Sequence, residues 1–107
     1  MKRRKEPQTI GATQPQSYSL SQNYPNPFNP ETTIKYQLLK VSQVKLEIFN
    51  LVGQRVTPLV DKEQLAGFYS VQWNGKDRSG RSVASGIYLY QLKAEDFVKV
   101  RKLTLLR

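Results

Sequence analysis

The stretch Asn-Tyr-Pro-Asn-Pro-Phe-Asn-Pro, residues 23–30, decides what the chain around it can form. Each proline fixes its own φ angle, lacks a backbone donor and pushes the preceding residue toward an extended conformation. A helix and a central strand are therefore excluded across the three prolines of this stretch, Pro25, Pro27 and Pro30. We expect a stiff edge segment or loop that lies across the domain, with the rings of Tyr24 and Phe28 inserted into the core. A polyproline II ligand for an SH3-like partner is the alternative.

Apolar residues recur at every second position after this stretch, which is the period of a half-buried strand. Residues 32–38 and 44–48 alternate in this way on either side of a short break, and together they predict a β-hairpin. Residues 55–60 predict a short strand, and Pro58 places that strand at a sheet edge. Residues 61–66 fit one helical turn or a loop.

Two aromatic strands are expected in the second half of the chain. The first, residues 67–73, should turn three side chains inward, namely Tyr69, Val71 and Trp73. The second, residues 85–92, has the pattern of a central strand whose inward side chains are Tyr88, Tyr90 and Leu92. We interpret the rings as core residues whose hydroxyl groups find hydrogen-bond partners, in preference to ligand contacts.

Glycines mark the turns that separate these strands. Gly53 lies in a predicted turn over residues 50–54, where a positive φ angle is expected. Gly67 and Gly86 each precede an aromatic strand, and we expect a positive φ angle or a close backbone approach at both. Residues 74–80 are dense in turn formers.

The strand spacing predicts the fold class. About seven short strands with turn signals between them are typical of an all-β, immunoglobulin-like antiparallel β-sandwich. In the final strand, residues 97–106, the apolar alternation shifts by one position at Arg101-Lys102, which suggests a β-bulge. We assign residues 18–107 to the sandwich and residues 1–17 to a disordered basic and polar tail or linker.

The composition argues against catalysis. The chain of 107 residues has no cysteine and no histidine, and only eight carboxylate side chains. The usual general base, thiolate nucleophile and neutral metal ligand are therefore missing, and we expect no enzyme activity, no cofactor and no metal site. Oxygen ligands for Ca²⁺ are conceivable in the turn that follows Trp73, but turn hydrogen bonding explains these residues better: Asn74, Asp77 and Ser79.

The formal net charge is +9, of which residues 1–7 supply +3, from four basic residues and one acid. The remaining basic residues fall at outward or turn positions, which predicts a solvated basic surface. Attraction to anionic lipid, polyanionic glycan or nucleic acid is the alternative. The basic residues do not line up with exposed aromatic residues that could stack on bases, which argues against nucleic acid. No stretch has the length of a transmembrane helix. The charged start at residues 1–5 is followed by polar residues and is not a complete export signal, so we expect either a piece of a longer precursor or a protein that stays where it is made.

Five sequence blocks occur together in one order. They are residues 23–36, 48–56, 66–75, 83–92 and 102–107. This series resembles the C-terminal sorting domains of the type IX secretion system, over about residues 20–107. The immunoglobulin-like domain of the flagellar hook-capping protein is similar in fold, and it shares the turn that begins Trp73-Asn74-Gly75.

The resemblance implies a function without catalysis. A sorting domain follows its cargo protein in the chain, passes through the periplasm and directs that cargo to the cell surface or the medium. Its implied partners are the outer-membrane translocon and a surface sortase, and we expect a monomer or weak self-association. A structural or adhesive immunoglobulin-like module, hook-cap-like or glycan-binding, is the alternative.

The final strand is the candidate recognition surface. A terminal edge strand offers unpaired backbone groups to a partner, and its charges prevent random pairing. The candidate residues on it are Lys99, Arg101, Lys102, Leu103, Leu105 and Arg107. The basic residues could instead serve only to keep an exposed edge soluble.

Overall fold

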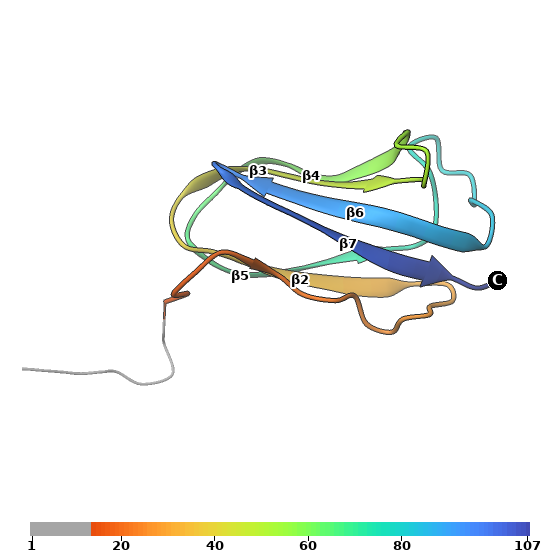
Figure 1. Ribbon diagram of the computed structural model, residues 1–107, viewed down its shortest axis with the longest axis horizontal. Helices are drawn as coiled ribbons and strands as arrows, with labels where there is room; N and C mark the ends of the chain where they lie inside the picture. The colour runs from red at the N-terminus through yellow and green to blue at the C-terminus, as the bar shows by residue number, and fades with distance from the viewer. Residues whose placement is uncertain (1–13) are drawn as a thin grey trace, which may run out of the picture.

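The computed structural model describes residues 14–107, which form seven strands in two antiparallel sheets packed face to face (Figure 1). The strands are β1 (Ser19–Leu20), β2 (Thr32–Leu38), β3 (Ser42–Phe49), β4 (Arg55–Gln64), β5 (Gly67–Trp73), β6 (Gly86–Ala94) and β7 (Phe97–Leu105). One sheet has the order β1-β2-β5 and the other has the order β4-β3-β6-β7. The predicted antiparallel sandwich is confirmed, and β6 is central, between β3 and β7.

The core lies between the sheets, where the inward side chains of alternate positions meet. Trp73 is buried at its centre, and its ring centroid lies 5.6 Å from those of both Phe28 and Tyr88. The Trp73 indole donates a hydrogen bond from Nε1 to the carbonyl oxygen of Lys76, at 2.9 Å. Tyr90 is fully buried, and Tyr69 packs against the core. The inward faces predicted for the two aromatic strands are therefore confirmed.

The predicted hairpin of residues 32–38 and 44–48 is wrong, because β2 and β3 belong to different sheets. Both strands bury the expected inward side chains, but Glu47, which the alternation places outward, is also buried and pairs with Arg55. The two strands lie in opposite sheets, and the chain crosses between the sheets at residues 39–41. An alternating pattern shows only that one face of a strand is covered. Two strands have this pattern whether they pair within one sheet or belong to opposite sheets.

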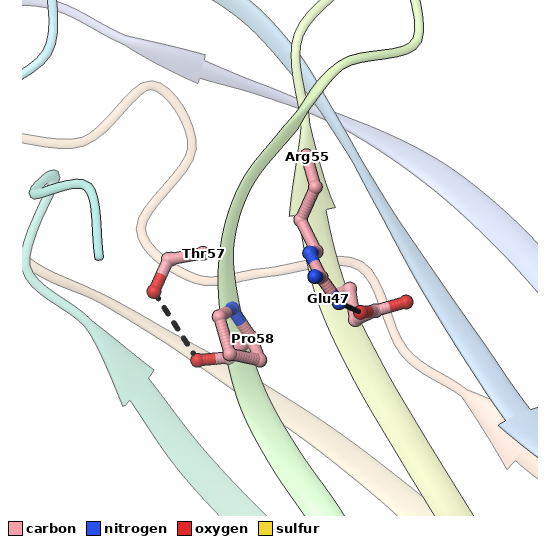
Figure 2. A network of polar contacts seen from close by, with 4 residues as sticks. All are labelled: Glu47, Arg55, Thr57 and Pro58. Atoms are coloured by element: carbon pink, nitrogen blue, oxygen red, sulfur yellow. Dashed lines mark hydrogen bonds and ion pairs between the residues drawn. The ribbon is translucent and has the colours of Figure 1, made fainter.

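β4 is longer than predicted, because residues 61–64 continue the strand and do not form a helical turn. The predicted edge position is confirmed. Two register shifts against β3 interrupt the pairing, and one of them adjoins Pro58, which lies opposite Glu47. Figure 2 shows this region, where Arg55 Nη1 donates to Glu47 Oε2 at 2.7 Å. The Thr57 hydroxyl donates to the Pro58 carbonyl oxygen at 3.3 Å.

β7 has no bulge, in contrast to the prediction at Arg101-Lys102. Its register with β6 is continuous from Ala94↔Phe97 to Gly86↔Leu105. The apparent step arises because Val98 and Val100 lie on the outer face of the sheet. Lys99 and Arg101 take inward positions near the margin of the core, where polar side chains can still reach partners or solvent.

The glycine predictions are confirmed at three positions. Gly53 has a φ angle of +88°, and Gly67 and Gly86 have φ angles of +154° and +155°. Most of the predicted tail, residues 1–13, lies outside the described residues. Within residues 14–107 no helix is long and apolar enough to cross a membrane.

We predict that Tyr90→Phe destabilises the domain by about 1–3 kcal/mol, because it leaves a buried amide without a partner. The Tyr90 hydroxyl donates to the Ser21 carbonyl at 2.7 Å and accepts from the backbone N–H of buried Asn23 at 2.8 Å. Urea unfolding of the purified protein measures the effect. Tyr88→Phe is the matched control, since the Tyr88 hydroxyl only donates, to Ala84 O at 2.7 Å. Equal losses in the two variants would contradict the role given to the Asn23 amide.

We also predict a loss of stability at alkaline pH. Burial raises the pKa of Tyr90 and of Tyr36 above the ordinary 10.0, despite hydrogen bonds that oppose the shift. The neutral phenol is therefore favoured in the folded state, and its contribution is complete below about pH 10 and falls as the pH rises through the folded-state pKa. Unfolding free energies measured from about pH 8 to 12 should fall, and fall less in Tyr36→Phe/Tyr90→Phe. An identical pH profile in that double variant would contradict the prediction.

Candidate recognition surface

β7 is the edge strand of the four-stranded sheet, so alternate backbone groups point away from β6. The hydrogen bonds of Thr104 identify which positions these are. Its N–H donates to Asn26 Oδ1 at 2.9 Å, and its carbonyl accepts from the Phe28 N–H at 3.0 Å. By alternation, the outward groups belong to Val98, Val100, Lys102 and Thr104.

The proline-containing segment, residues 23–30, covers the C-terminal half of this edge. Phe28 forms a parallel bridge with Leu105, and its carbonyl accepts from the Leu106 N–H at 3.0 Å. Gln22 adds a side-chain donor, Nε2, at 2.7 Å from the Lys102 carbonyl. The expected edge segment across the sandwich is confirmed, and the ring of Phe28 is buried as predicted.

Tyr24 does not insert into the core, because 80% of it is exposed. Its backbone pairs with Thr33 in both directions at 2.9 Å, which turns the ring outward. The inward position next to it belongs to Asn23, whose Nδ2 donates to Thr32 Oγ1 at 3.0 Å and to Pro25 O at 3.2 Å. Sequence reasoning missed this buried polar pair, although an asparagine in front of proline and aromatic residues is a signal for a turn-forming hydrogen bond.

The six candidate recognition residues differ in accessibility. Leu103 and Leu105 are fully buried, so their assignment to an exposed recognition surface is corrected: they are core residues. Arg101 donates from Nε to the Leu20 carbonyl at 2.6 Å, and this bond joins β7 to β1. Lys99 and Lys102 are exposed, and neither forms an ion pair within residues 14–107.

Arg107 holds a turn in place. Its Nε donates to the Val83 carbonyl at 2.7 Å, and its Nη2 donates to the Gly75 carbonyl at 2.6 Å. The backbone N–H of Arg107 also donates to Ser85 Oγ at 2.9 Å. The guanidinium lies so close to Gly75 that a Cβ there would be 2.7 Å from Nη2. Gly75, with a φ angle of +73°, is a second residue whose importance the sequence reasoning missed.

Apolar side chains adjoin the open part of the β7 edge on the outer face of the sheet. A shallow cavity of about 270 Å³ is lined there by Phe49, Gly53, Leu89, Gln91 and Val100. Cross-strand pairing explains the grouping, since Phe49 lies opposite Leu89 and Gln91 lies opposite Val100. The open edge and this apolar face therefore form one surface.

The turn over residues 74–80 is held by its own side chains. Asp77 Oδ1 accepts from the Ser79 hydroxyl at 2.7 Å, from the Ser79 N–H at 2.9 Å and from the Arg81 N–H at 3.0 Å. These bonds, the hydroxyl bond foremost, hold the pKa of the Asp77 carboxyl below its usual range. The predicted turn hydrogen bonding is confirmed. In the part of the chain that the structure describes, no group of acidic side chains could hold a metal ion.

A family comparison identifies the class of domain. The model of the FlgD Ig-like domain matches residues 28–96. The chain belongs to the FlgD Ig-like domain family. The matched range of this FlgD Ig-like domain extends from Phe28 to the residue before β7, so the candidate recognition strand lies outside it. No curated protein sequence matches the chain.

Two solved structures contain domains with the same fold. Dimeric latent PorU from Porphyromonas gingivalis matches 91% of this chain with a TM-score of 0.68 and 16% identity. PorZ from the same organism, described as an essential bacterial surface component of the type IX secretion system, matches 84% with a TM-score of 0.56 and 21% identity. The matches cover 10% of the PorU chain and 11% of the PorZ chain, so this FlgD Ig-like domain corresponds to about a tenth of each protein.

We predict that Gly75→Ala destabilises the domain by about 1–3 kcal/mol, since alanine is strained at a positive φ angle and its Cβ displaces the Arg107 guanidinium. Thermal unfolding followed by circular dichroism measures the loss. Gly53→Ala is the matched control, because Gly53 also has a positive φ angle but a Cβ there meets no atom within 4 Å. A similar loss in both variants would mean that the contact with Arg107 contributes nothing.

Proposed function

We propose that this FlgD Ig-like domain is a non-catalytic C-terminal sorting domain that directs a protein joined to its N-terminus through the type IX secretion system. The observation that carries the proposal is the shared fold with a domain of PorZ, a surface component of that system. The ordered series of sequence blocks that resembles type IX sorting domains supports the same function.

The polar side chains of the domain that could take part in catalysis are used instead to stabilise the fold. The Asp77 carboxylate and the Ser79 hydroxyl are engaged in a turn. The hydroxyl groups of Tyr88 and Tyr90 donate to backbone carbonyls. These side chains stabilise the fold, and a function in recognition needs nothing more from them.

The domain proposed to carry the signal comprises residues 18–107, with residues 1–17 as the linker to the cargo. It passes through the periplasm, binds the outer-membrane translocon and a surface sortase, and reaches the cell surface or the medium. It acts as a monomer or with weak self-association. Lys99 and Lys102 are the exposed cations on β7 proposed to contact this machinery.

An export assay tests the proposal. The full chain of 107 residues is fused behind a reporter with its own periplasmic signal, in a host with an active type IX system. We predict that the reporter reaches the surface or the medium, and that Lys99→Glu/Lys102→Glu lowers the exported fraction about tenfold or more because it reverses the charge of the edge. Immunoblots of the periplasm, surface and medium measure the distribution.

The matched control is Lys35→Glu/Lys40→Glu, which makes the same change of charge at two exposed positions outside β7. A wild-type fusion that stays in the periplasm would overturn the sorting function. Equal export of both double variants would overturn the contribution of Lys99 and Lys102, but it would not contradict the sorting function. Truncation of the last residues is a poor test, since it removes Leu103 and Leu105 from the core.

A structural or adhesive module is the second candidate, and membership of the FlgD Ig-like family favours it. The two functions differ in what happens to the domain after export. A sorting domain is cut from its cargo, whereas an adhesive module stays attached while it binds. Mass spectrometry of the secreted fusion distinguishes them by the presence or absence of cleavage at about residues 14–20.

A further inference from the structure

The outward backbone groups of β7 are hydrogen-bonded over one half and unpaired over the other among residues 14–107, although Tyr18 stacks on Phe97 and the Leu20 carbonyl accepts from Arg101 beside the unpaired half. Gln22, Asn26 and Phe28 occupy the outward backbone groups from the Lys102 carbonyl to Leu106. The outward groups of Val98 and Val100 form no hydrogen bond with any other part of residues 14–107. An unpaired stretch over residues 97–102 is long enough for a short strand to pair with it.

The side chains of this open stretch alternate between valine and basic residues over 98–101. Val98 is 52% exposed and Val100 is 45% exposed, and both point to the outer face of the sheet. Edge strands that must stay unpaired are normally blunted by proline, bulges or charge. The opposite edge, β4, has these features, with Pro58, two register shifts and charged residues at 61–63.

The charged side chains of the open stretch itself are all basic, whereas the turn before it carries Glu95 and Asp96. Lys93 lies directly across from Val98 and also across from Lys45 on the neighbouring strand. Lys99 and Lys102 belong to the stretch itself and are exposed. A second copy of β7 would bring these lysines close to one another, and like charges across a strand pair are destabilising. An acidic partner meets no such repulsion.

We propose that residues 97–102 bind an extended segment of a partner protein in which apolar and acidic residues alternate, and that this segment adds a fifth strand to the sheet. The inference rests on the proposed recognition function of β7 and adds the form and the charge of what is recognised. Successive side chains of the added strand point to opposite faces of the sheet, so its apolar and acidic residues must alternate. Its apolar residues lie beside Val98 and Val100 on the outer face, next to the cavity lined by Leu89, and its acidic residues point to the other face beside Lys99.

Binding of a synthetic peptide to the purified full chain tests the proposal. The probe is a dye-labelled peptide of about six residues that alternates glutamate and valine, to match the open stretch. Fluorescence anisotropy should report saturable binding that weakens with salt. Hydrogen exchange should show protection of the amides of Val98 and Val100 when the peptide is present. A peptide of alternating lysine and valine should bind at least about tenfold more weakly, because its charged residues point to the face of Lys99 and repel it.

Two changes remove the backbone pairing itself. Val100→Pro deletes an outward N–H that β6 does not use, and should weaken binding about tenfold. Val100→Thr keeps the N–H and the branched shape but puts a hydroxyl into the apolar contact, so it should weaken binding less than Val100→Pro does. A probe with N-methylated valines lacks backbone donors at those residues and tests the backbone pairing with an unaltered protein. It therefore tests strand addition even if the proline variant fails to fold. Lys99→Glu should weaken binding of the acidic probe, and Lys35→Glu is its control.

Absence of binding by the wild-type chain at low salt would overturn the proposal, and so would equal affinity for the N-methylated probe. Neither result bears on the export assay, which uses the whole machinery of the host. Export without peptide binding would support the sorting function and contradict strand addition at β7. Peptide binding without export would support strand addition and contradict the sorting function.

Discussion

The whole arrangement depends on the segment of residues 23–30, which is hydrogen-bonded to both sheets at once. Its backbone pairs with β2 through Tyr24 and Thr33, and with the end of β7 through Phe28 and Leu105. Prolines suit this course, since a chain with fixed φ angles and few donors does not join a sheet as a regular strand, and bends at residues 25–27 and 29–30 accompany its two bridges. The buried ring of Phe28 packs against Trp73 and anchors the segment to the centre of the core.

Much of the fold could be predicted from the sequence because strands leave a period of two in their apolar residues. The inward faces of β2, β3, β5 and β6 were predicted correctly on this basis, as was the edge position of β4 from Pro58. The sheet to which a strand belongs is a different matter. The same alternation satisfies a partner beside a strand and a partner across the core, so β2 and β3 were wrongly paired.

The candidate surface was harder to predict, because accessibility depends on the other strands. Leu103 and Leu105 have the types and spacing of edge residues, but they complete the core beneath β6. Arg101 and Arg107 are cations by type, yet their guanidinium groups are bound to backbone carbonyls. A local pattern does not contain the position of Leu20 or Val83, which lie far away in the chain. Lys99 and Lys102 remain exposed because no such carbonyl lies opposite them among the described residues.

The bonds between the N-terminal part of the domain and β7 connect residues about 80 positions apart, as in the pairs Gln22–Lys102 and Arg101–Leu20. Contacts of such separation form only after the entropy of closing a long loop has been overcome, which slows folding. The two ends of the domain therefore come together late, and until they do, β7 lacks the cover of residues 22–28. Before that closure, the outward backbone groups of Lys102 and Thr104 are as uncovered as those of Val98 and Val100. The timing of closure thus decides how long the domain is open to incorrect association.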